Sequence, residues 1–377
     1  MPNIGIICEY NPLHGGHEKQ LKAVREAFPG CGVVCLMSGN FVQRGTPAIL
    51  DTILRTEAAL ECGADLVLEM PITGSLSSAE GFARCGVEIL GGFCDYLCFG
   101  TESGDRDSLT DTAKALLSDA FSEQLKATLE TGVSFPKARQ MALERMGADA
   151  RLLEKPNDIL GVEYCKAILS CGTDMKPYPI FRGGDYHTAE ANTENPSATA
   201  VRGLMAAGEP WESYVPEKAA ALFRNAPLHT LEKGEKAVLY RLRTMTDAEF
   251  AALPFGSEGL WRKLMHAARK ENTLDGILNS VKTKRYTYTR ISRMVMCAYL
   301  GITEELLSAP APYTRVLGLN DTGRTILKNA RKTGTFLNAG QTPPESAYAE
   351  LETRARRLYG LFGENTALSA DCRVIVK

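Results

Sequence analysis

Two histidines near the start of the chain have the type and spacing that phosphate chemistry needs. His14 and His17 flank Gly15 and Gly16, directly after a turn at residues 10–12. In the first turn of a helix, imidazoles three residues apart share a face and can stabilise charge on a phosphate under attack. The glycines leave room for a triphosphate to approach the backbone. Taken alone, such a pair could also be a metal site or a surface feature.

The elements around the histidines favour the first interpretation. Strand patterns alternate with helix patterns: strands at residues 3–9, 32–38, 65–70, 94–100 and 176–181, and helices at 16–28, 48–62, 76–90 and 158–170. Apolar strands separated by single helices indicate a parallel sheet with right-handed crossovers. The histidines then lie at the carboxyl end of the first strand and the start of the first helix, where such folds bind anions. We therefore predict a nucleotide site there, with chemistry at the α-phosphate of ATP.

The second half of the chain has a different pattern. Helices are predicted at residues 216–223, 231–245, 260–270, 287–300 and 346–362, and a strand only at 313–319. We therefore predict two domains, an ATP-binding α/β domain at residues 1–205 and a mainly helical domain at residues 206–377.

The charge of the chain is unevenly distributed. The net charge is −2, but residues 261–377 carry 19 Lys and Arg against 10 Asp and Glu. A basic second part suggests a polyanionic partner, although solvated helix faces would explain the same count. No apolar run is long enough to span a bilayer and no secretory signal is seen, so we expect a cytoplasmic protein without membrane contact.

The cysteines are expected to be reduced and structural. There are eleven, several of them inside apolar strand patterns, and no CxxC pair occurs. A zinc site is the alternative, but the spacing does not favour it, and no metal ligand is assigned.

The strand, the HxGH sequence and the helix together resemble the nucleotidylyltransferase superfamily, a relative of the class I aminoacyl-tRNA synthetases. The resemblance implies a Rossmann-like domain and a second phosphate-binding segment that ends in arginine. Residues 196–202, PSATAVR, match that segment, with Ser197, Thr199 and Arg202 as its polar side chains. This segment departs from the superfamily pattern in having Pro196 where an apolar residue is common. A Ser or Thr cap on a helix from about residue 198 is an alternative that is compatible with this role.

Further segments resemble the bacterial tRNA(Met) cytidine acetate ligase family more narrowly. They are collinear and cover most of the chain: residues 9–17, 37–45, 63–71, 99–102, 155–161, 186–187 and 284–290. The resemblance implies His14 and His17 as catalytic residues. It also implies an ATP site made of Ile7, Cys8, Glu9, Tyr10, Asn11, Pro12, Leu13, His14, Gly15, Gly16, His17, Glu18, Lys19 and Gln20, with Gly100, Asn157, Arg182, Ser197, Thr199 and Arg202.

Three of these positions have a physical reason of their own. Gly100 ends a strand, where a side chain would collide with a base or ribose. Asn157 could bond the adenine or ribose, or cap the helix predicted from residue 158. Arg182 could pair with the triphosphate or cap the sheet edge, and it lies one residue nearer residues 186–187 than the family pattern implies.

Two polar clusters are expected to contact the substrate or RNA. The loop after the second strand carries Asn40, Gln43 and Arg44. A basic cluster of Lys282, Lys284, Arg285, Arg290 and Arg293 is interleaved with Tyr286 and Tyr288. Cations and aromatic rings together suit contacts with RNA phosphates and stacking on bases.

The resemblance implies an ATP-dependent tRNA modification. Acetate would be activated as acetyl-adenylate, with Mg²⁺ on the phosphates, and the acetyl group transferred to N4 of the wobble cytidine of elongator tRNA(Met). DNA is not an expected partner. The alternatives are a nucleotidylyltransferase of a small phosphorylated metabolite, and a non-catalytic RNA- or ribosome-binding protein with a nucleotide-binding fold.

Overall fold

A mixed, mostly parallel sheet forms the centre of the computed structural model, which describes residues 1–182, 197–364 and 373–377. The strand order within the described residues is β10-β8-β5-β2-β1-β6-β7, and β9 pairs with β8. The strands are β1 (Asn3–Cys8), β2 (Gly32–Ser38), β5 (Leu66–Met70), β6 (Tyr96–Thr101), β7 (Lys176–Phe181), β8 (Thr314–Leu319), β9 (Phe336–Asn338) and β10 (Ile375–Val376). The predicted Rossmann-like α/β architecture with a helical part is confirmed.

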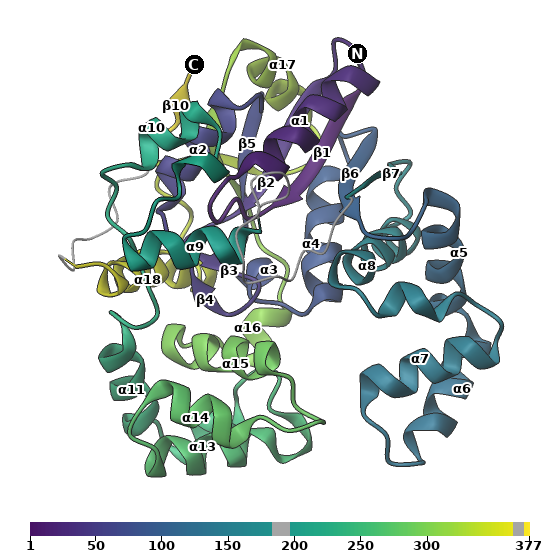
Figure 1. Cartoon of the computed structure of the whole chain (residues 1–377), viewed down its shortest axis with the longest axis vertical. Coiled ribbons are helices and arrows are strands. Elements are labelled where there is room, and N and C mark those ends of the chain that lie inside the picture. The colour runs from purple at the N-terminus through teal and green to yellow at the C-terminus, as the bar shows by residue number, and fades with distance from the viewer. Residues whose placement is uncertain (183–196, 365–372) are drawn as a thin grey trace.

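Helices connect the parallel strands and cover both faces of the sheet (Figure 1). They are α1 (Gly15–Ala27), α2 (Thr52–Glu61), α4 (Ala79–Leu90), α8 (Pro156–Cys171) and α17 (Asp321–Ala330). Alternate residues of β2 belong to different cores: Val33 and Cys35 pack on the side of α1 and α2, and Val34 and Leu36 on the side of α4 and α8. Successive side chains of a strand point to opposite faces, so a strand that is covered twice reads as a continuous apolar run.

Several cysteines serve as small apolar residues of these cores. Cys35 and Cys98 lie in one core and Cys94 and Cys165 in the other, and all four are buried. The ten cysteines in the described part of the chain are free thiols, in agreement with the prediction of reduced, structural cysteines.

A helical lobe follows the sheet domain in the chain. After α9 (Ala198–Ala207) and α10 (Glu217–Phe223) come α11 (Glu235–Thr244), α12 (Asp247–Ala251), α13 (Leu260–Lys270), α14 (Leu274–Val281), α15 (Tyr288–Leu300) and α16 (Glu304–Ser308). Helix α18 (Ala347–Tyr359) joins the apolar core of α11, α13, α14 and α15. The predicted helical character of this part is therefore observed.

The sheet is not confined to residues 1–205, however. Strand β8 pairs antiparallel with β5, and β9 and β10 extend the same sheet. Without β8, the buried apolar strand β5 would be an exposed edge, and such edges pair readily with other chains. The strand expected at residues 313–319 is thus present, but it belongs to the sheet of the first domain.

The other edge of the sheet is β7, which is protected by two prolines. On the side that faces β6, the N–H of Lys176 donates to the carbonyl oxygen of Asp95 at 2.9 Å, and the N–H of Arg182 donates to the carbonyl oxygen of Thr101 at 2.8 Å. Along the strand, successive N–H groups point alternately toward β6 and away from it. Pro177 and Pro179 occupy positions where an N–H would point away from β6, so the sheet loses no hydrogen bond at these prolines.

Three helices without a counterpart among the predicted elements lie between β6 and α8. They are α5 (Arg106–Leu117), α6 (Asp119–Leu129) and α7 (Phe135–Arg145). In Figure 1, α6 and α7 lie apart from the group formed by α11, α13 and α14. Two short elements also matter for the site: the hairpin of β3 (Phe41–Val42) and β4 (Thr46–Pro47), and helix α3 (Ile72–Ser75). Among the described helices, none is both long and apolar enough to cross a membrane.

Candidate nucleotide-binding and active site

The two histidines organise the first turn of α1. His14 is the N-cap residue, and its Nδ1 accepts the N–H of Gly16 at 3.1 Å. The Nδ1 of His17 accepts the N–H of His14 at 3.3 Å, which completes a reciprocal capping box. Since both Nδ1 atoms are acceptors, the proton of each neutral ring is on Nε2. Each neutral imidazole therefore carries its one N–H donor at Nε2, on the side of the ring away from the capping bond.

The environment keeps both rings neutral. The rings are stacked, with 3.8 Å between their centroids. Burial, followed by the charges of Arg182 and Arg202, lowers the pKa of His14 to about 3. Burial, followed by the charges of His14 and Arg182, lowers the pKa of His17 well below its ordinary value. At neutral pH, the histidines are hydrogen-bond donors without charge, and the nearby cations are arginines.

Helix α9 brings the second predicted phosphate segment to the same place. Ser197 caps the helix by accepting the N–H of Ala200 at 3.0 Å, so the capping role is confirmed. Arg202 donates to the carbonyl oxygen of Asn11 at 2.6 Å and to Oγ1 of Thr199 at 3.1 Å. The turn before the histidines and the PSATAVR segment are thereby tied together.

Gly100 and Arg182 form a pair at the ends of β6 and β7. A Cβ atom at Gly100 would lie 2.2 Å from Cδ of Arg182. The absence of a side chain at Gly100 makes room for the arginine side chain, and space there for a base or ribose stays a prediction. Residues 186–187 of the sequence pattern lie outside the described residues.

Asn157 does not cap the following helix. Helix α8 begins at Pro156 with Lys155 as the N-cap, and the side-chain amide of Asn157 donates to Oε1 of Glu102 at 2.8 Å. Asp158, which sequence reasoning did not single out, is fully buried and accepts from Oγ1 of Thr101 at 2.5 Å. This carboxylate fixes the start of α8 against the end of β6.

Several of these segments line one cavity of about 150 Å³. Its walls are Glu9, Asn11, Val42, Arg44, Thr46, Pro156, Asn157, Ser197, Ala198, Thr199 and Arg202. His14 and His17 are not among these wall residues, but Asn11 comes three residues before His14, and the charge of Arg202 contributes to the lowered pKa of His14. Residues predicted for the ATP site therefore meet in this cavity. They come from the carboxyl end of β1 and the first turns of α8 and α9, which are far apart in the sequence.

The three polar residues of the loop after β2 have different surroundings. Asn40 is buried, and its Oδ1 accepts from the backbone N–H and the hydroxyl of Thr52 at 3.1 and 2.7 Å. Gln43 donates its backbone N–H to Oε1 of Glu9 at 2.8 Å. Arg44 is exposed and lines the cavity. Of the three, Arg44 has the side chain that reaches the site, whereas Asn40 stabilises the loop.

Arg55 of α2 is a second residue that sequence reasoning missed. It is completely buried and donates to the carbonyl oxygens of Leu50, Glu9, Ser38 and Gly39. The carbonyls at Glu9 and Ser38 lie at the carboxyl ends of β1 and β2. Arg55 therefore holds the two strand ends that carry the site. Its place on the same helix face as the small residues Ala58 and Ala59 is the sequence signal of this role.

The basic cluster of the helical lobe divides into exposed and buried residues. Lys282, Lys284 and Arg285 are exposed, and Arg285 forms an ion pair of 2.9 Å with Glu258. Tyr286 is buried, and its hydroxyl donates to the carbonyl oxygen of Glu258 at 2.7 Å. The expectation that this tyrosine stacks on RNA is therefore wrong, because its ring is used in the core of the lobe.

The two arginines that end the cluster are also engaged within the protein. Arg290 donates to the carbonyl oxygen of Phe255 at 2.8 Å. Arg293 is 8% exposed and donates to the carbonyl oxygen of Gln43 at 3.4 Å, across to the β3–β4 hairpin. Arg293 is thus a contact between the lobe and the site, and its burial leaves little surface for RNA.

Comparison with known proteins identifies the family. The family described as HIGH Nucleotidyl Transferase matches residues 1–371. Two relatives named tRNA(Met) cytidine acetate ligase are 35% identical (Clostridium perfringens) and 38% identical (Clostridium novyi), and each alignment covers 97% of both chains. The chain belongs to the tRNA(Met) cytidine acetate ligase family.

Solved structures of another member have the same fold throughout. Thermotoga maritima TmcAL in its apo form is 29% identical and superposes with a TM-score of 0.91 over 100% of both chains. The same protein bound with alpha-thio ATP gives a TM-score of 0.88, again over 100% of both chains. The family assignment therefore extends to the helical lobe as well as to the sheet domain.

Proposed function

We propose that this chain activates acetate with ATP and acetylates N4 of the wobble cytidine of elongator tRNA(Met). In the first step, an acetate oxygen attacks the α-phosphorus, the bond from phosphorus to the bridging oxygen breaks, and diphosphate leaves. In the second step, N4 attacks the acetyl carbonyl, the carbon–oxygen bond to AMP breaks, and N4 loses a proton. Activation is needed because acetate is an anion and N4 donates its lone pair to the ring.

The observation that carries this proposal is the joint placement of the α1 N-terminus and the arginine-ending segment of α9. His14 and His17 would donate from Nε2 to oxygens of the transferring phosphate, at the positive end of the α1 helix dipole. Arg182 and Arg202 supply the positive charge that the neutral histidines lack. Donors that are already in place and uncharged need no proton transfer when charge develops in the transition state.

The ATP contacts proposed for the remaining residues follow from the walls of the cavity. Thr199, Arg202 and Arg44 are suited to phosphate oxygens, and Asn157 to the ribose or adenine. The exposed Lys282, Lys284 and Arg285 are proposed to contact tRNA phosphates. We further propose that the enzyme acts in the cytoplasm, where its tRNA substrate is found.

Mg²⁺ fits this site as an ion carried by the phosphates. The described residues contain no group of three or more Asp, Glu, His or Cys side chains that could enclose a metal. Mg²⁺ commonly binds through substrate phosphates, waters and one or two carboxylates, and Glu9 is the carboxylate in the cavity wall. When bound, the ion would offset negative charge on the diphosphate.

Isotope exchange tests the two steps separately. Labelled diphosphate should enter ATP in the presence of acetate alone, and labelled acetate should then appear in tRNA(Met) as N4-acetylcytidine. Lack of acetate-dependent exchange would exclude acetate activation. Exchange without transfer to tRNA would retain the adenylate and exclude the RNA substrate. Exchange that depends on a small phosphorylated metabolite in place of acetate would support the other nucleotidylyltransferase function.

A further inference from the structure

The described residues line two further grooves that differ in charge. The first lies between the β6–α5 loop and the edge strand β7, and Asp105, Arg106 and Asp107 are in its wall. The second has a volume of about 340 Å³ and lies between the β3–β4 hairpin, α9 and the start of α15. The second groove is continuous with the ATP cavity, because Arg44, Thr46 and Arg202 line both.

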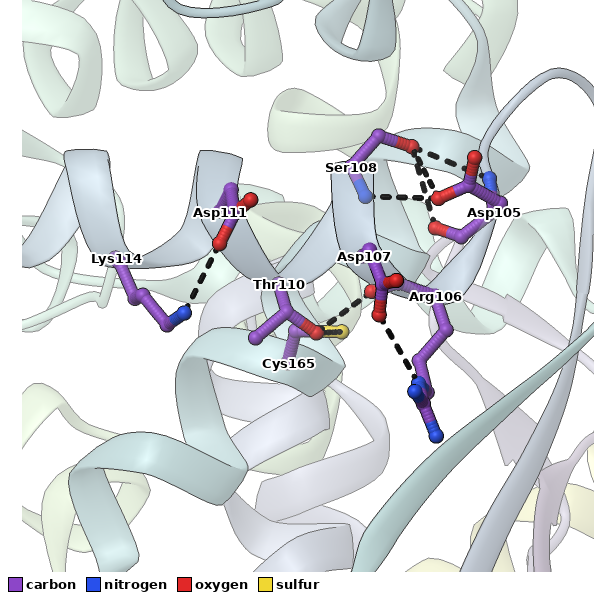
Figure 2. Close-up of polar contacts among 8 residues, drawn as sticks. All are labelled: Asp105, Arg106, Asp107, Ser108, Thr110, Asp111, Lys114 and Cys165. Atoms are coloured by element: carbon purple, nitrogen blue, oxygen red, sulfur yellow. Dashed lines mark hydrogen bonds and ion pairs between the residues drawn. The ribbon is translucent and has the colours of Figure 1, made fainter.

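The first groove is unfavourable for a polyanion. Figure 2 shows Asp105 bonded to Ser108 at the start of α5 and the side chain of Arg106 directed to Asp107. The distances are 2.8 Å from the Ser108 N–H to Oδ1 of Asp105, and 3.2 Å for the ion pair. Among the described residues of this wall, Arg106 is the one cation, and it is already paired, so an excess of carboxylate remains. Phosphates that approach here would meet negative charge.

The second groove has the opposite character. Arg44 and Arg202 contribute positive charge, and none of the described residues in its wall is an Asp or Glu. Tyr288 stands at the first position of α15 with 39% of its surface exposed, and Thr289 follows it in the wall. An exposed aromatic ring beside cations is the combination that binds unpaired nucleotides, through stacking and phosphate contacts.

The walls of this groove are held against each other. Gly45 of the hairpin has φ = +76°, and a Cβ atom there would lie 2.4 Å from the backbone nitrogen of Arg293 in α15. The hairpin therefore rests directly on the backbone of α15. Thr287 caps the helix by accepting the N–H of Arg290 at 3.4 Å, which places Tyr288 in an ordered first turn. The groove is thus formed in advance of binding.

From these observations we infer that the second groove is the acceptor-nucleoside subsite. It receives one unpaired nucleotide of an RNA loop, whose base stacks on Tyr288 and whose backbone lies near Arg44. This assignment rests on the proposed function, because the nucleotide is taken to be the cytidine that accepts the acetyl group. The wall shared with the ATP cavity gives its base a direct path to an acyl-adenylate. A base in a folded loop must leave its stack to enter, and an aromatic partner offsets that cost.

Removal of the aromatic ring is the most direct test. Tyr288→Ala should raise the KM for tRNA(Met) in acetyl transfer, with a loss of about 5- to 150-fold in kcat/KM, the range for one stacked base. Acetate-dependent exchange of diphosphate into ATP should be unchanged. Tyr288→Phe should retain transfer, because the stacking surface is kept. Tyr240→Ala, at a tyrosine of α11 that is 72% exposed and outside the groove, is the matched control and should change neither rate.

The outcomes separate the subsite from the proposed function. If the unaltered protein shows no acetate-dependent exchange, the proposed function fails. If it carries out both steps and Tyr288→Ala transfers acetyl groups at the normal kcat/KM, the subsite is overturned. A loss of exchange in Tyr288→Ala would also overturn it, since the tyrosine would then serve the ATP site. Loss of transfer in Asp107→Asn, with no loss in Tyr288→Ala, would place the nucleotide in the acidic groove instead.

Discussion

Replacement of His14 by asparagine should remove part of the acid sensitivity of the fold. Burial lowers the pKa of His14 from 6.5 to about 3. Between these two values, the unfolded chain binds a proton that the native chain excludes, so stability falls as the pH falls. The contribution is present in full above about pH 6.5 and is progressively lost below it. At about pH 5, the expected loss from this one residue is about 2 kcal/mol relative to neutral pH.

Asparagine is the appropriate substitution because it preserves the cap. Its side-chain oxygen can accept the N–H of Gly16 in place of Nδ1, and asparagine is among the preferred N-cap residues. The variant therefore removes the titrating group and leaves the start of α1 with its acceptor. It also removes an Nε2–H donor, so exchange activity should fall while the protein remains folded.

Urea unfolding followed by circular dichroism measures the effect. The free energy of unfolding is determined for both proteins at about pH 7.5 and about pH 5. The unaltered protein should lose about 2 kcal/mol more than His14→Asn between the two conditions. An equal loss in both proteins would refute the reasoning, because it would mean that His14 accepts a proton in the native state as readily as in the unfolded chain.

Three further predictions concern the site, the fold and the lobe. His17→Ala should reduce acetate-dependent exchange by about 10²- to 10³-fold, as expected for loss of one preorganised donor, while tRNA retention on filters stays the same; loss of retention instead would place His17 outside the ATP site. Arg55→Met should destabilise the protein by at least about 3 kcal/mol in urea unfolding, because buried carbonyl oxygens at the ends of β1 and β2 lose a charged donor; an unchanged unfolding midpoint would contradict its structural role. Lys284→Ala combined with Arg285→Ala should weaken tRNA binding and lower the slope of log affinity against log salt by about 1 to 2, with Lys328→Ala on α17 as the control; a slope equal to that of the control would remove these residues from the RNA surface.

The sequence alone determined the elements whose signals are local. The strand before the histidines, the helix after them and the cap at Ser197 depend on residues within a few positions of each other. Apolar runs and capping residues therefore predicted the parallel sheet and placed the HxGH turn at a strand end. The family resemblance then supplied the substrate and the acceptor, which no local pattern specifies.

The tertiary structure decided how these elements meet. Arg202 bonds to Asn11 from 191 positions away, and Arg293 bonds to Gln43 from 250 positions away. The periodicity of a sequence does not predict contacts between residues so far apart in the chain. For the same reason, the sequence could not show that Arg55 is buried between strand ends or that Tyr286 belongs to the core of the lobe. A basic side chain looks the same in the sequence whether it faces water, a carbonyl oxygen or an RNA phosphate, and only the packing of distant segments around it distinguishes these environments.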